Sequence, residues 1–101
     1  MKIWVDDVRP APDGYVWCKS VNETIGFIEE IEEYLGIETI ELIDLDYDSG
    51  EYEKDGGPYI KLMDWLVERG TLYPLVFHSQ NCVGMEYMKR MYRRYWLRES
   101  L

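Results

Sequence analysis

The sequence predicts an α/β fold: a mostly parallel sheet of about four strands, with helices on both faces in three layers. Short apolar runs alternate with longer segments whose apolar residues recur at helical spacing. Their order is strand, strand, helix, strand, helix, strand, helix, which is typical of parallel strands joined by crossover helices. The length of 101 residues suits one domain, which we place at residues 1–101.

The first half of the chain contains two predicted strands and a helix. A strand at residues 3–5 is followed by a loop rich in proline and glycine, and a second strand by residues 15–18. Ser20 and Glu23 have the spacing of a capping box, so a helix begins there and ends at Gly36. Its apolar stripe is Ile25, Ile28, Ile31 and Leu35. We interpret its acidic face, Glu29, Glu30, Glu32 and Glu33, as solvated.

The second half contains two further strands, each followed by a helix. Residues 39–45 have apolar side chains at both parities, as in a parallel strand covered on both faces. Pro58 suits the first turn of a second helix that ends near Gly70, with the apolar face Ile60, Met63, Leu66 and Val67. A strand at residues 73–77 follows, with Pro74 at its entrance. The last helix runs from about residue 83 to 98 and is expected to bury Met85, Met88, Met91 or Tyr92, and Tyr95.

Composition excludes several classes of function. The net charge of −9 argues against a protein that grips duplex nucleic acid through its phosphates, although a small phosphorylated ligand is allowed. Cys18 and Cys82 form neither a spaced metal pair nor a disulfide framework, and we interpret both as free thiols. The apolar run at the N-terminus is too short for a signal sequence or a membrane span. We therefore expect a soluble cytoplasmic protein without membrane contact.

Three of the predicted strands end in acidic or hydrogen-bonding side chains. These groups are Asp6 and Asp7, then Asp46 and Asp48, then His78, Ser79 and Asn81. The carboxyl ends of neighbouring parallel strands form the crevice where open α/β sheets bind ligands. Carboxylates crowded there need a counter-ion, and Mg²⁺ or Mn²⁺ accepts such oxygen ligands. We predict Asp6, Asp7 and Asp46 as metal ligands, although the first two are equally suited to capping the turn that follows.

The remaining site residues are predicted around a phosphate. Asp44, Asp46 and Asp48 alternate, which places Asp44 lower in the strand and the other two at the rim. His78 is the only histidine, and the residues alone allow either a structural or a functional role. Functional groups beside it favour an anion site: Ser79, Asn81 and the helix start at Gly84, with Arg9 from the first loop as a second clamp. For Arg9, simple solvation is the alternative.

Three motifs together resemble the cyclic-phosphate processing receiver-like domain family, over nearly the whole chain. They are Asp6-Asp7-Val8-Arg9-Pro10; Leu45-Asp46-Tyr47-Asp48 with Gly50; and His78-Ser79-Gln80-Asn81 with Gly84 and Met88. The resemblance implies a shortened, flavodoxin-like receiver fold and a divalent-metal pocket formed by the aspartates. It also implies a role in hydrolysing or binding cyclic phosphates on nucleotides or RNA ends. This chain departs from the pattern at Tyr47, where the family usually has histidine, at Ser49, where leucine is usual, and at Cys82, where proline is usual.

Two hypotheses follow from the residues and the resemblance. In the first, the protein is a metal-dependent phosphoesterase, in which His78 protonates the leaving alkoxide and Asp48 is a further ligand or the general base. Asp46 could also form an aspartyl-phosphate, but no lysine follows at a further strand end to complete a receiver-type site. In the second, the same pocket binds a phosphorylated nucleotide-like ligand or a protein partner without turnover, and Tyr47 stacks on a base. A third alternative is a protein-interaction domain that uses the aromatic residues near 92–96.

Overall fold

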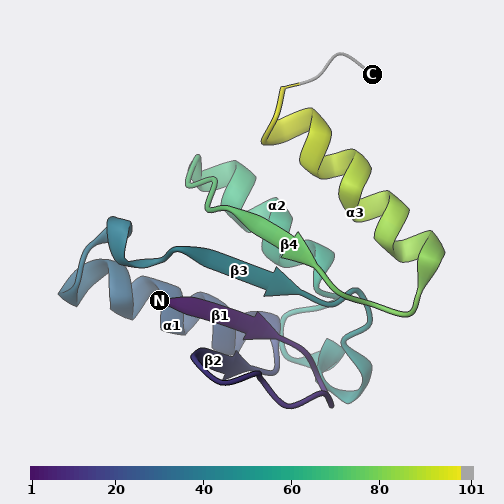
Figure 1. The fold of residues 1–101 in the computed structure, drawn as a ribbon, viewed down its shortest axis with the longest axis horizontal. Helices are drawn as coiled ribbons and strands as arrows, with labels where there is room; N and C mark the ends of the chain where they lie inside the picture. The colour runs from purple at the N-terminus through teal and green to yellow at the C-terminus, as the bar shows by residue number, and fades with distance from the viewer. Residues whose placement is uncertain (99–101) are drawn as a thin grey trace.

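The computed structural model describes residues 1–98 and contains one four-stranded parallel sheet (Figure 1). The strands are β1 (Lys2–Val5), β2 (Tyr15–Cys18), β3 (Leu42–Leu45) and β4 (Leu75–Phe77), in the spatial order β2-β1-β3-β4. The helices are α1 (Val21–Tyr34), α2 (Ile60–Arg69) and α3 (Cys82–Tyr95), with short 3₁₀ turns at Ile37–Thr39 and Gly50–Lys54. The predicted α/β class, parallel sheet and element order are confirmed.

The helices differ from the prediction in one respect, because all three pack on the same face of the sheet. Strand residues of one parity, including Ile3, Val5, Ile43 and Leu45, form a single buried cluster with Ile28 of α1, Leu62 and Met63 of α2, and Met88 of α3. In Figure 1, α1 and α2 lie behind the strands, and α3 lies beside β4. Both crossovers run in the same direction across the sheet, so right-handed connections place both helices on one side. The described chain therefore has two layers rather than three.

The opposite side of the sheet, which we call the open face, carries the strand residues of the other parity. By register and alternation these are Lys2, Trp4, Tyr15, Trp17, Leu42, Asp44 and Val76. Within residues 1–98 no helix covers this face, and Val76 is 46% exposed. Trp4 is nevertheless buried, because Tyr15 and His78 pack against its ring and its Nε1 donates to the carbonyl of Arg9.

Several local predictions are confirmed, and others need correction. Ser20 caps α1 by accepting a hydrogen bond from the amide of Glu23, and Gly70 ends α2 in a left-handed conformation. Leu35, predicted to continue the buried stripe of α1, is 55% exposed because α1 ends at Tyr34. Tyr95 is also exposed, since the chain leaves the sheet edge there. The third and fourth strands begin later than predicted, because residues 37–39 form a 3₁₀ turn and the extended pairing of β4 starts only after Pro74.

Glu32 also differs from its predicted solvated state. Its carboxylate accepts hydrogen bonds from Arg69 Nη2 at 2.5 Å, from Arg69 Nη1 at 3.3 Å and from the hydroxyl of Tyr73. Burial alone would raise the pKa of Glu32, but the hydrogen bonds from Arg69 and Tyr73 outweigh it and lower the pKa below its usual value. The interaction joins α1 to α2 and to the entrance of β4.

This lowered pKa predicts how stability depends on pH. Glu32 contributes stability at pH values above its unfolded pKa of about 4.5, and the contribution is lost as the pH falls through the lower folded pKa. We expect Glu32→Gln to be destabilised relative to the wild type at pH 6–7, with the difference shrinking at acidic pH. Urea unfolding of both proteins across this pH range measures the effect, and a difference that stays constant with pH would contradict it.

No helix in the described part of the chain is long and apolar enough to cross a membrane. Both cysteines are free: Cys18 is buried, while Cys82 is exposed at the first residue of α3. Burial, with a smaller contribution from Glu23, raises the pKa of the Cys18 thiol to about 12, so this thiol stays protonated at neutral pH.

Candidate functional site

The carboxyl ends of three neighbouring strands bring Asp6, Asp46 and His78 together. Asp6 follows β1, Asp46 follows β3 and His78 follows β4, and backbone hydrogen bonds continue the ladder between these strand ends. The amide of Asp46 donates to the carbonyl of Val5, and that of His78 to the carbonyl of Leu45. One ligand atom from each of the three side chains lies within 4.8 Å of the other two. We call this group the strand-end cluster.

Asp6 is fully buried and already engaged by protein groups. Its Oδ1 accepts hydrogen bonds from the amides of Val8 (2.9 Å) and Arg9 (2.7 Å), and its Oδ2 lies 2.8 Å from His78 Nε2. Burial raises the pKa of Asp6, but these two amides and His78 outweigh burial and lower it. Asp6 therefore stays ionised, and it caps the turn after β1, which was one of the two alternatives that the sequence left open.

His78 is held by carboxylates at both ring nitrogens. Nδ1 lies 2.6 Å from Asp44 Oδ1, and Nε2 lies 2.8 Å from Asp6 Oδ2. The ring stacks on Trp4 with 3.6 Å between centroids and 5° between planes. Burial lowers the pKa of His78, but the hydrogen bonds and charges of Asp44 and Asp6 outweigh burial and raise it. A nitrogen must carry a proton to donate to a carboxylate, so this geometry favours the imidazolium with both nitrogens as donors.

Asp44 is the residue that the sequence analysis placed lower in the strand and left without a role. It is only 9% exposed and lies on the open face, where the strand register places Trp4 and Val76 beside it. A sequence signal for the pair existed, because Asp44 has the same parity as Asp46 and lies one strand from His78. The register between β3 and β4, which the sequence does not reveal, decides that these two side chains meet.

Asp46 and Asp7 are the carboxylates that lack a full set of compensating partners. Asp46 is 7% exposed, and burial, together with the negative charge of Asp6, raises its pKa despite hydrogen bonds from the Tyr47 amide and Ser79 and the charge of His78. Burial and Asp6 also raise the pKa of Asp7. Asp7 is not part of the strand-end cluster; its carboxylate lies against Gly50, where no side chain would fit. Both groups would gain from a cation nearby.

The donor set of the strand-end cluster suits a divalent ion. Two carboxylates and one imidazole offer oxygen and nitrogen ligands, and the oxygen atoms suit Mg²⁺ or Mn²⁺. Buried carboxylates with raised pKa values are the groups that such an ion would stabilise in the charged form. Of the three predicted ligands, the structure therefore places Asp6 and Asp46 together, with Asp7 beside them.

The residues predicted to surround a phosphate form the start of α3. Asn81 caps the helix, because its Oδ1 accepts from the amide of Gly84 at 2.9 Å, while Ser79 Oγ accepts from the amide of Asn81 at 3.1 Å. Tyr47 packs its ring against Gly84. The Gly84 amide, which we predicted to face a phosphate, is thus bonded to its own cap, and Tyr47 is half-buried rather than projecting into solvent.

The contact between Tyr47 and Gly84 leads to a prediction with an internal control. A Cβ at Gly84 would overlap the ring of Tyr47, whereas a Cβ at Gly26, an exposed position within α1, would meet nothing within 4 Å. Gly84→Ala should lower the free energy of unfolding by about 1–3 kcal/mol. Gly26→Ala should raise it by about 0.5–1 kcal/mol, because alanine is the better helix former. Urea unfolding of both variants tests this, and equal effects at the two positions would contradict it.

The other predicted residues lie at the rim. Asp48 is exposed, and its Oδ1 lies 3.5 Å from Asn81 Nδ2. Arg9 is exposed in the loop between β1 and β2, where its backbone carbonyl accepts from Trp4. Both side chains border the strand ends without belonging to the close cluster.

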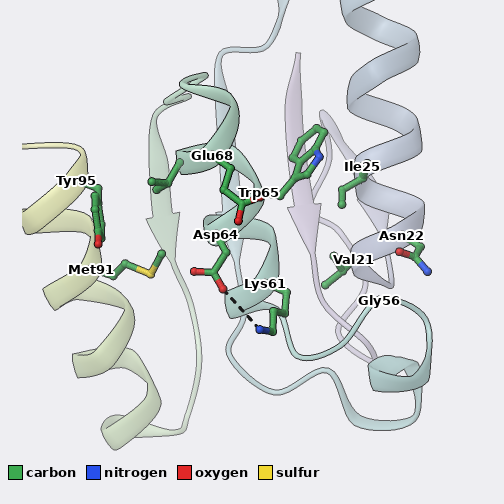
Figure 2. Close-up of a pocket in the computed structure, with 11 residues that line it drawn as sticks. Val21, Asn22, Ile25, Gly56, Lys61, Asp64, Trp65, Glu68, Met91 and Tyr95 are labelled. Carbon is green, nitrogen blue, oxygen red and sulfur yellow. Dashed lines mark ion pairs between the residues drawn. The ribbon is translucent and has the colours of Figure 1, made fainter.

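The largest hollow of the described surface lies elsewhere. It has a volume of about 470 Å³ and is lined by residues of the three helices, including Ile25, Trp65 and Met91 (Figure 2). Lys61 and Asp64 form an exposed ion pair of 3.9 Å on α2 at this hollow. None of the predicted site residues lines it. The chemistry-bearing side chains gather instead at the strand ends, so we base the functional argument on them.

The fold and the strand-end cluster together define a receiver-like α/β domain with acidic and imidazole groups at the carboxyl edge of its sheet. Comparison with known families matches residues 1–94 to the family described as Cyclic-phosphate processing Receiver domain. Because the match spans nearly all of the chain, the protein belongs to this family. Searches of curated proteins and of solved structures found no match.

Proposed function

We propose that the protein is a metal-dependent phosphoesterase that opens a cyclic phosphate on a nucleotide-like or RNA-end-like ligand. The observation that carries the proposal is the convergence of Asp6, Asp46 and His78 within 4.8 Å at the ends of three adjacent parallel strands. A buried imidazole between carboxylates, at the edge where open sheets bind ligands, has the composition of a phosphoryl-transfer site. Membership of a cyclic-phosphate processing family supports the class of ligand.

A divalent ion, Mg²⁺ or Mn²⁺, would be held by Asp6 and Asp46 with Asp7 beside them, and would supply charge stabilisation to a phosphoryl oxygen. The protein groups supply the proton transfers. Water attacks phosphorus, one ester P–O bond of the ring breaks, and the leaving alkoxide takes a proton from His78 Nε2. The raised pKa of His78 keeps this proton available near neutral pH. Asp48, at the exposed rim, accepts the proton of the attacking water.

The polar residues at the start of α3 would orient the ligand. Ser79 and Asn81 lie directly after His78 and carry hydroxyl and amide groups. Arg9 approaches from the loop after β1 and would pair with a phosphoryl oxygen. The overall charge of −9 restricts this role to small ligands or strand ends and disfavours an extended grip on duplex nucleic acid.

One observation favours the second candidate, a module that binds a phosphorylated ligand or a protein partner without turnover. Both nitrogens of His78 are occupied by carboxylates, and the Gly84 amide is bonded to Asn81. A site whose donors are already engaged must rearrange before it can assist a reaction. In this case His78 would neutralise the acidic pocket, and Tyr47, half-buried against Gly84, would contact the base of a ligand.

A turnover assay with two variants separates the candidates. The purified protein is incubated with cyclic and acyclic phosphates of nucleosides, with Mg²⁺ or Mn²⁺ and with EDTA, and monoester products are separated chromatographically. The enzyme hypothesis predicts metal-dependent product that both Asp46→Asn and His78→Ala abolish, while Asp13→Asn, in the exposed first loop, retains it. Ligand binding that survives His78→Ala, without product from any protein, would support the binding module instead.

A further inference from the structure

Asp44 is a charged residue in an apolar part of the sheet. It lies within β3, is 9% exposed, and has Trp4 and Val76 as its neighbours in register on the open face. A buried carboxylate between apolar side chains is costly unless it is hydrogen-bonded. Its hydrogen-bond partner is His78 Nδ1, at 2.6 Å, and this is a contact between residues 34 positions apart.

Three contacts together fix the orientation of the His78 ring. Asp44 binds Nδ1, Asp6 binds Nε2 at 2.8 Å, and Trp4 stacks on one face of the ring. Asp44 lies back along β3, whereas Asp6 and Asp46 follow the ends of their strands. The ring therefore directs Nδ1 into the sheet and Nε2 toward the strand-end cluster, where a ligand would arrive.

We propose that Asp44 is a positioning residue, which holds the proton of His78 on Nδ1 and thereby presents Nε2 to the crevice. Its consequence for turnover rests on the proposed phosphoesterase function, but its consequence for the ring does not. A carboxylate behind a functional histidine selects which nitrogen is protonated and stops the ring from flipping. Trp4 completes the arrangement by blocking one face of the imidazole.

The test uses the fact that His78 is the only histidine of the chain, so its ring nitrogens give unambiguous ¹⁵N signals. In the wild type we expect a protonated Nδ1 whose hydrogen exchanges slowly with water. Asp44→Leu removes the acceptor, and leucine suits the apolar surroundings, so the variant should fold. Its Nδ1 signal should move to the position of an unprotonated nitrogen, with the proton on Nε2 facing Asp6. Asp44→Asn keeps an acceptor oxygen and should retain a protonated Nδ1, and Asp13→Asn should match the wild type.

The positioning role is overturned by an unprotonated Nδ1 in the wild type, or by a nitrogen pattern that Asp44→Leu leaves unchanged. The wild-type spectrum alone provides the first of these tests, whatever the stability of the variants. With a turned-over ligand, Asp44→Leu should lower kcat by about 10–100-fold with little change in KM. The expected nitrogen pattern in a protein that turns over no cyclic phosphate would reject the proposed function and uphold the positioning role.

Discussion

Asp46→Asn should make the metal-free protein more stable and at the same time remove its activity. Asp46 is nearly buried, and its pKa is raised by burial and by the charge of Asp6. Neutralising it removes an unfavourable buried charge, while the amide oxygen of asparagine still accepts from the Tyr47 amide, which now donates at 2.7 Å. We expect a gain of about 0.5–2 kcal/mol in the free energy of unfolding, measured in urea with EDTA present.

Adding Mn²⁺ should reverse the order of the two proteins. The wild type should bind the ion and be stabilised by it, while Asp46→Asn should show little stabilisation, because binding to the folded state alone shifts the unfolding equilibrium. Manganese binding can be followed directly by electron paramagnetic resonance, with Asp13→Asn as the matched carboxylate control. A variant that is less stable than the wild type without metal, or that binds Mn²⁺ as tightly, would show that Asp46 has a different role.

Substitution of His78 should have the opposite effect on stability. His78→Gln removes the only side chain that bonds both Asp6 and Asp44, and it leaves two nearly buried carboxylates without their cation. Removing one partner of a buried ion pair costs about 3–5 kcal/mol, so the variant should unfold at markedly lower urea concentration. Under the phosphoesterase hypothesis, loss of the proton donor also lowers turnover by about 10²–10⁴-fold.

A second substitution separates charge from packing in this prediction. Combining His78→Gln with Asp44→Asn neutralises one of the exposed partners, so the double variant should be more stable than the sum of the two single effects predicts. Strict additivity would mean that Asp44 and His78 do not interact in solution. An unchanged free energy of unfolding in His78→Gln alone would contradict the bridging geometry altogether.

The fold was largely predictable because its signals are local. Alternating apolar runs, the capping box at Ser20 and the glycine after α2 each act within a few residues. The number of layers was not predicted, because it depends on the strand order and on the direction of each crossover. With β1 and β2 joined by a loop, no helix is available within residues 1–98 to cover the open face.

The candidate site was only partly predictable, for a related reason. Polar residues at strand ends predicted where Asp6, Asp46 and His78 would meet. The pairing of Asp44 with His78 depends on the register between strands, and the contact of Tyr47 with Gly84 depends on how α3 packs. The departure of Glu32 from a solvated state has the same origin, because its partners Arg69 and Tyr73 are distant in sequence.

The measurement that tests the central claim most directly is the ³¹P NMR spectrum of a 2′,3′-cyclic nucleotide with the wild-type protein and Mg²⁺, recorded over time beside Asp46→Asn. The account predicts that the cyclic resonance is replaced by a monoester resonance with the wild type and persists with the variant. A cyclic resonance that persists with both, in a panel extended to 3′,5′-cyclic nucleotides and to Mn²⁺, would contradict the phosphoesterase function.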